Sequence, residues 1–158
     1  MLFRSGMAQG LENWSNLASK GVTEIKSTFG KTQVLIKITN HEFEIGKPSD
    51  QRPKQILSSC TYARFPCSPV DYLEIFVNGQ PLFVARSVYA DLADVNKAKL
   101  QRKKGQFILT LDGGDASESF TLALFFDEQL IKKRILKSNE ANQVLQETTY
   151  SAPKAMDD

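Results

Sequence analysis

The sequence predicts a mainly β protein: an antiparallel β-sandwich or barrel with an N-terminal amphipathic helix and one short internal helix. Short segments in which apolar and polar residues alternate recur along most of the chain, which is the pattern of half-buried strands. Turn residues separate these segments closely, and the strand–helix–strand rhythm of a parallel α/β fold is absent. At 158 residues, the chain suits a single domain that needs no metal or disulfide to fold.

The first element is expected to be a helix over residues 10–29. Its apolar residues recur every three or four positions, the spacing of one helix face; they are Leu11, Trp14, Ala18, Val22, Ile25 and Phe29. Gly30 suits the left-handed conformation that ends many helices. We expect this helix to pack on its own sheet with Trp14 covered, the alternative being an arm that docks on a partner.

These observations divide the chain into a helical segment over residues 6–30, a β domain over 31–150 and a polar tail over 151–158. Leu2-Phe3-Arg4-Ser5 is what a widely used sequencing-adaptor end encodes when it is translated. Residues 1–5 are therefore a possible sequencing-adaptor artefact and are left out of the predicted fold.

The β domain is predicted from its alternating segments, which lie at residues 34–38, 42–45, 72–77, 80–85, 107–111, 120–126, 130–136 and 144–150, with a weaker pattern over 55–63. The strongest local signal is Asn78-Gly79, the preferred pair for a two-residue type I′ hairpin. That turn sets Ile75 opposite Leu82 and Leu73 opposite Val84.

Ser87 is a reasonable N-cap for the short internal helix. Val88, Leu92 and Val95 follow at helical spacing, which predicts about two turns. Residues 96–105 then form a basic, exposed segment.

No recognisable catalytic apparatus is present. The only histidine, His41, lies in a predicted turn, and two cysteines with one histidine fall short of a zinc site. The stretch from Asp112 to Asp115 does not match a calcium loop and reads better as a hairpin turn. No cofactor or metal is expected, and Cys60 and Cys67 are expected to be reduced thiols near the core.

Two basic segments stand out, over residues 97–104 and 132–137. In a twisted sheet they could combine into one positive face, but the nearby aromatics Phe120, Phe125 and Phe126 are expected in the core. We interpret the lysines as a solvated strand that protects a sheet edge. The candidate interaction surface comprises Trp14, Lys103, Lys104, Lys132, Lys133 and Arg134.

The leading hypothesis is a non-catalytic interaction or structural module whose partner is another protein of unknown identity. The alternatives are a nucleic-acid-associated protein using the basic segments, which is not favoured, and a carboxylate- or metal-dependent hydrolase. The formal net charge of +2 implies no anionic partner by itself. No membrane span and no leader are visible, so a soluble, cytoplasmic protein is expected.

Overall fold

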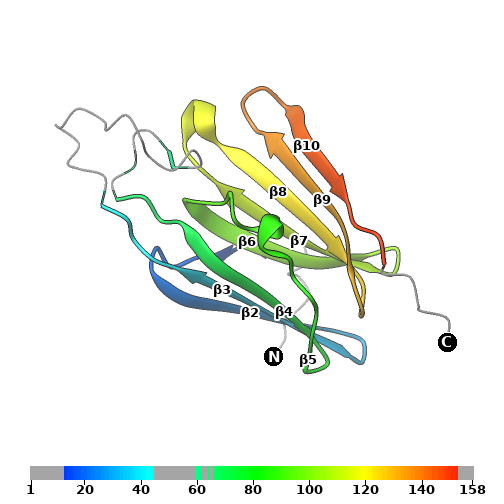
Figure 1. Ribbon diagram of the computed structural model, residues 1–158. Helices are drawn as coiled ribbons and strands as arrows, with labels where there is room; N and C mark the ends of the chain where they lie inside the picture. The colour runs from blue at the N-terminus through cyan, green and yellow to red at the C-terminus, as the bar shows by residue number, and fades with distance from the viewer. Residues whose placement is uncertain (1–12, 45–59, 62–63, 65, 153–158) are drawn as a thin grey trace, which may run out of the picture.

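The computed structural model describes residues 13–44, 60–61, 64 and 66–152 and has two antiparallel β-sheets that do not close into a barrel. Figure 1 shows the sheets as two layers, with the smaller one at the lower left. One hydrophobic core draws its residues from both sheets. The mainly β prediction is therefore confirmed, as a sandwich of two open sheets.

The larger sheet has six strands in the order β1-β6-β7-β8-β9-β10. Their bounds are Ser15–Asn16, Val95–Lys103, Gln106–Gly113, Phe120–Phe126, Ile131–Ser138 and Gln143–Thr149. The smaller sheet has the order β2-β3-β4-β5, with bounds Gly21–Phe29, Thr32–Asn40, Val70–Val77 and Gln80–Pro81. Two single 3₁₀ turns, η2 (Arg86–Val88) and η3 (Ala116–Glu118), join strands.

Alternation along each strand places the core between the sheets. Ile36 and Ile38 of β3 are fully buried, as are Leu122 and Leu124 of β8. The two layers meet directly where the ring of Phe29, at the end of β2, lies 5.5 Å from that of Phe107 in β7. Each strand therefore offers one face to the core and the other outward.

The predicted helix over residues 10–29 is wrong, because residues 15–16 and 21–29 form β1 and β2. Ile25 is buried, whereas Val22, on the same predicted helix face, is 58% exposed. Thr23 and Ser27 lie on the inward side of β2 and conceal its alternation in the sequence. Gly30 lies in the turn to β3 instead of ending a helix. Trp14 is half-buried, and residues 10–12 lie outside the described residues.

The predicted internal helix is also wrong. Only the single turn η2 forms at Ser87, and Val95 begins strand β6. The segment over residues 96–105, predicted only as basic and exposed, is mostly this strand. A bulge between Val95 and Lys97 shifts the alternation at the start of the strand by one residue, so only the short alternating run from Lys97 to Leu100 marks it in the sequence.

The Asn78-Gly79 hairpin is confirmed. Both residues have positive φ, as a type I′ turn requires, and Val77 pairs with Gln80. The Leu82 amide donates to the Ile75 carbonyl at 2.9 Å. The ladder ends there, so the predicted Leu73–Val84 pair does not belong to it.

Replacing Gly79 with valine should destabilise the protein by about 1 kcal/mol or more. Gly79 has φ +81°, a conformation that a β-branched side chain resists. A Cβ at this residue would meet no other atom within 4 Å, so the effect would be backbone strain alone. Urea unfolding measures it, and an unchanged midpoint would contradict the turn geometry.

The remaining predicted strands agree with β3, β4, β7, β8, β9 and β10 to within a few residues. Phe43, in the predicted strand over residues 42–45, forms only an isolated bridge with Cys67. Most of the weak segment over 55–63 and of the predicted tail over 151–158 lies outside the described residues. No helix in the described part of the chain is long and apolar enough to cross a membrane.

Candidate functional site

The two basic segments lie on strands of one sheet. The segment over residues 97–104 includes most of β6, and the segment over 132–137 belongs to β9, with β7 and β8 between them. Registered residues of neighbouring strands project from the same face of a sheet. One such row runs Lys97, Asp112, Thr121, Lys137, and the next runs Lys99, Thr110, Ala123, Ile135.

Alternation decides which side these lysines occupy. Ala98 and Leu100 are buried against the core, so Lys97 and Lys99 project outward from β6. Lys133 and Lys137 project outward from β9, on the side that the registered rows share. We call the outer side of the six-stranded sheet the basic face; its lysines are Lys97, Lys99, Lys103, Lys133 and Lys137. The alternation of lysines with Ala98 and Leu100 was the sequence signal for this face.

Two aromatic side chains belong to the basic face. Trp14 immediately precedes β1, and its ring centroid lies 4.7 Å from the Nζ of Lys97 and 4.7 Å from that of Lys99. Phe125 lies in a registered row with Lys133, whose Nζ is 5.2 Å from the ring centroid. Of the aromatics expected in the core, Phe126 is fully buried, but Phe125 is half-buried on the outer side.

Among the described residues, two carboxylates share the basic face with the five lysines. Asp112 accepts hydrogen bonds from Thr121 at 3.1 Å and from Asn139 at 3.0 Å. Glu147 lies on the edge strand β10, opposite Ile135. The face thus carries more positive charge than the chain's formal net of +2. Counting only the described residues, a band free of carboxylates crosses the sheet; it is formed by Trp14, Lys99, Gln101, Ile108, Phe125 and Lys133.

Three of the predicted lysines lie near one end of the sheet, among them Lys103 of the basic face. Lys103 ends β6, and Lys104 lies in the turn to β7. Lys132 Nζ is 3.4 Å from an oxygen of Asp127. Partial burial alone would raise the pKa of Asp127, but hydrogen bonds from two backbone amides and the nearby Lys132 outweigh it and hold the pKa below 3.8.

Arg134 does not belong to an exposed surface, which corrects its place in the predicted interaction surface. Its side chain points into the sandwich and is 2% exposed. The guanidinium donates to the Val88 carbonyl at 3.0 Å, to Gln146 at 2.6 Å and to Asp91 at 2.5 Å. Its role is therefore to connect β9 with β10 and with the segment after β5.

The interpretation of the second basic segment as edge protection is wrong as well. β10 pairs along β9, so β9 is an interior strand of the sheet. The lysines of β9 therefore do not block aggregation at a sheet edge, and their positive charge needs another explanation.

The candidate catalytic groups remain apart. His41 Nδ1 lies 2.7 Å from an oxygen of Asp71, with both side chains reached by water. Asp112 is held by Thr121 and Asn139 on the basic face, while Asp115 is an exposed residue at the start of η3. Among the described residues, no three His, Cys, Asp or Glu side chains are grouped to hold a metal ion.

A hollow of about 330 Å³ opens at one end of the sandwich. Leu92, Phe120, Leu136 and Leu145 contribute its apolar lining. Asp91 also lines it, but this carboxylate is already bonded to Arg134. Thr61 and Glu118 complete the lining and are themselves engaged in interactions, so the hollow combines apolar contact with polar groups that already have partners.

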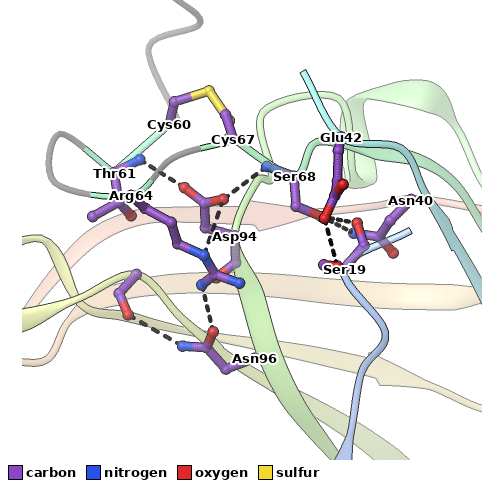
Figure 2. Close-up of polar contacts among 11 residues, drawn as sticks. Ser19, Asn40, Glu42, Cys60, Thr61, Arg64, Cys67, Ser68, Asp94 and Asn96 are labelled. Atoms are coloured by element: carbon purple, nitrogen blue, oxygen red, sulfur yellow. Dashed lines mark hydrogen bonds and ion pairs between the residues drawn. A yellow bond between two sulfur atoms is a disulfide. The ribbon is translucent and has the colours of Figure 1, made fainter. Parts of the chain in front are cut away.

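Cys60 and Cys67 form a disulfide with their Cα atoms 5.6 Å apart, so the prediction of reduced thiols is wrong. The loop that they close is bonded to the buried Asp94, as Figure 2 shows. Asp94 accepts from the amides of Thr61 and Ser68, each at 2.8 Å, and Arg64 Nε lies 3.6 Å from it. The spacing of two cysteines alone does not reveal this arrangement.

The backbone of Asp94 explains the two glycines at the end of β7, Gly113 and Gly114. A Cβ on Gly113 would lie 2.7 Å from the Asp94 carbonyl oxygen, and the Gly114 amide donates to that oxygen at 3.0 Å. Glycine is therefore required at residue 113, because a side chain there would collide with the Asp94 backbone and the Phe120 ring. In the described part of this loop, the disulfide and the bonds to Asp94 hold the end of the sandwich together, and Thr61 also lines the hollow.

Replacing both Cys60 and Cys67 with alanine should lower the free energy of unfolding by roughly 2–3 kcal/mol. The disulfide restricts the unfolded chain by closing a loop with a sequence separation of 7. Urea unfolding of the variant and of the reduced native protein should give the same loss. Equal stability with and without reductant would contradict the bond.

Comparisons of the chain with protein-family models, with curated proteins and with solved structures found no match. The geometry described above is therefore the whole basis for a functional proposal.

Proposed function

We propose that this protein is a non-catalytic β-sandwich module that binds an anionic partner through the basic face. The observation that supports it is the strand register, which brings lysines of two distant segments to one side of one sheet. Like charges gathered on a folded surface repel one another, and an anionic ligand relieves that repulsion. Such a surface also speeds the encounter with an anionic partner.

The sequence favoured another protein as the partner, with no charge specified. The basic face favours an anionic partner instead. A flat face with five lysines and two carboxylates favours a polyanion, because many weak contacts act together on a repeating ligand. The interaction-module hypothesis remains, with the basic face in place of the separate residues predicted from the sequence. No arrangement of carboxylates among the described residues favours the hydrolase alternative.

The disulfide argues against the cytoplasmic location. Such bonds persist mainly in oxidising compartments, so we place the working protein there. Alkylation of the native protein without reductant, followed by mass spectrometry, tests this placement. Labelled Cys60 and Cys67 would overturn it.

The binding proposal is tested with heparin, a sulfated polyanion, at low salt. Each exposed ion pair contributes about 0.2–1 kcal/mol, so the variant Lys99→Gln with Lys133→Gln should bind about 2- to 30-fold more weakly. The matched control is Lys20→Gln with Lys26→Gln, which removes the same charge from exposed residues elsewhere. Equal losses in both variants would overturn the proposal, as would failure of the native protein to bind heparin or any other anionic probe.

A further inference from the structure

We infer that the basic face binds single-stranded nucleic acid, with bases stacking on Trp14 and Phe125 and phosphates contacting the lysines. This inference rests on the proposed function and names the class of anion. It is supported by the pairing of each aromatic ring with a lysine, since proteins that bind single strands without sequence preference combine cationic surface with aromatic platforms.

The width of the sheet argues against double-stranded ligands. Six neighbouring strands span about 24 Å, because adjacent strands lie about 4.8 Å apart. The major groove of B-form DNA is about 12 Å wide and admits a helix or a two-stranded ribbon. The face is thus too broad to enter a groove, and bases stacked inside a duplex cannot reach its aromatic rings.

The band free of carboxylates gives a single strand a continuous path. It runs from Trp14 beside β1 to Lys133 on β9, four strand spacings or about 19 Å. At the stacked spacing of about 3.4 Å, roughly six nucleotides cover that distance. Ile108 and Phe125 form an apolar floor between Lys99 at one side and Lys133 at the other.

The lysines beside the rings indicate how binding proceeds. The ammonium groups of Lys97 and Lys99 are held near the Trp14 ring by cation–π attraction. A phosphate attracts an ammonium more strongly, so each lysine can move to a phosphate while a base takes its place on the ring. The exchange leaves the aromatic surface covered and the charge neutralised.

A sulfated glycan and a membrane fit the lysines and aromatic rings of the basic face less well than a single strand does. A chain of sulfated sugars satisfies the lysines but provides no flat aromatic group for the rings. A bilayer needs apolar side chains that protrude past the charged ones, whereas Trp14 and Phe125 are half-buried. Both ligands are therefore comparison arms of the experiment.

The experiment measures binding of a short oligodeoxythymidylate to the full chain, with titration of tryptophan fluorescence as one readout. Trp14 is the only tryptophan, so its quenching reports contact at the basic face. We expect the single strand to bind more tightly than a duplex of equal length. Phe125→Leu should weaken binding about 5- to 150-fold, and Trp14→Leu should do the same if it folds.

The matched control is Phe83→Leu, because Phe83 is 81% exposed and follows β5 of the other sheet. It should leave binding unchanged. Lys99→Gln with Lys133→Gln should reduce the slope of log K against log salt by about 1.4. That readout separates phosphate contacts from stacking.

The outcomes distinguish the two proposals. The nucleic-acid inference alone would be overturned if heparin, or vesicles containing phosphatidylserine, bound through the lysines as tightly as the oligonucleotide did. Phe125→Leu would then have no effect on binding. Failure of every anionic probe to bind would overturn both proposals. Quenching of Trp14 by the oligonucleotide, together with loss of affinity in Phe125→Leu, would support the inference.

Discussion

Asp94→Ala should lower the free energy of unfolding by about 3–5 kcal/mol, because it removes the acceptor of two buried amides and the charge opposite the partly buried Arg64. Asp94 is 0% exposed, and its two oxygens accept the amides of Thr61 and Ser68. Alanine would leave both donors and the charge of Arg64 without this acceptor. A domain has only about 5–15 kcal/mol of total stability, so the variant should be marginal.

Urea unfolding measures this loss, with two further variants as controls. Asp94→Asn keeps one acceptor oxygen, and asparagine tolerates the φ of +56° at this residue, so its stability should be intermediate. Asp115→Ala removes an exposed carboxylate nearby and should change stability by less than about 0.5 kcal/mol. A similar small effect for Asp94→Ala would show that the loop does not depend on it.

Arg134→Ala is expected to cost about 3 kcal/mol or more, because a buried arginine with satisfied hydrogen bonds leaves unpaired groups behind when it is removed. The Val88 carbonyl and Gln146 would each lose a donor. Arg134→Lys should not restore stability, because one ammonium cannot serve three acceptors in the directions of a planar guanidinium.

Lys133→Ala is the matched control for the Arg134 variants. It removes the neighbouring cation from the basic face, where the side chain is half-exposed, and should change stability by less than about 0.5 kcal/mol. Chemical unfolding of the two variants thus tests the strand orientation. Equal losses would contradict the placement of Lys133 and Arg134 on opposite sides of β9.

The sequence predicted best where short-range chemistry decides the structure. Asn78-Gly79 supplies positive φ at both turn residues, and the flanking strands β4 and β5 follow from it. Strand β8 coincides with its predicted range because its alternation is unbroken. In both cases the information lies within a few neighbouring residues.

The same reasoning failed for β2 and β6, where the alternation is disguised. In β2, the inward Thr23 and Ser27 read as polar, while Val22, Ile25 and Phe29 happen to match helical spacing. The bulge in β6 shifts its pattern by one residue. In both β2 and β6, pairing with distant strands overrides the secondary-structure preference of the local sequence. A single sequence does not show which strands pair.

The candidate surface was only partly predictable for a related reason. Clusters of basic residues show where charge accumulates along the chain, but strand register decides which charges meet. Lys133 and Arg134 are sequence neighbours, yet one projects outward and the other is buried. Phe125 and Phe126 separate in the same way, because successive residues of a strand face opposite sides. The register of β6 to β9 was needed to join the two segments.

The short strand β1 has a consequence for how fast the chain can fold. Ser15 pairs with Ala98, so this contact joins residues separated by much of the chain, while β2 next to it in sequence belongs to the other sheet. Closing so long a loop costs conformational entropy before the pairing returns any stability. Domains dominated by such non-local pairs fold on the order of milliseconds to seconds. Until β1 docks on β6, Trp14 remains away from Lys97 and Lys99, and the basic face is incomplete.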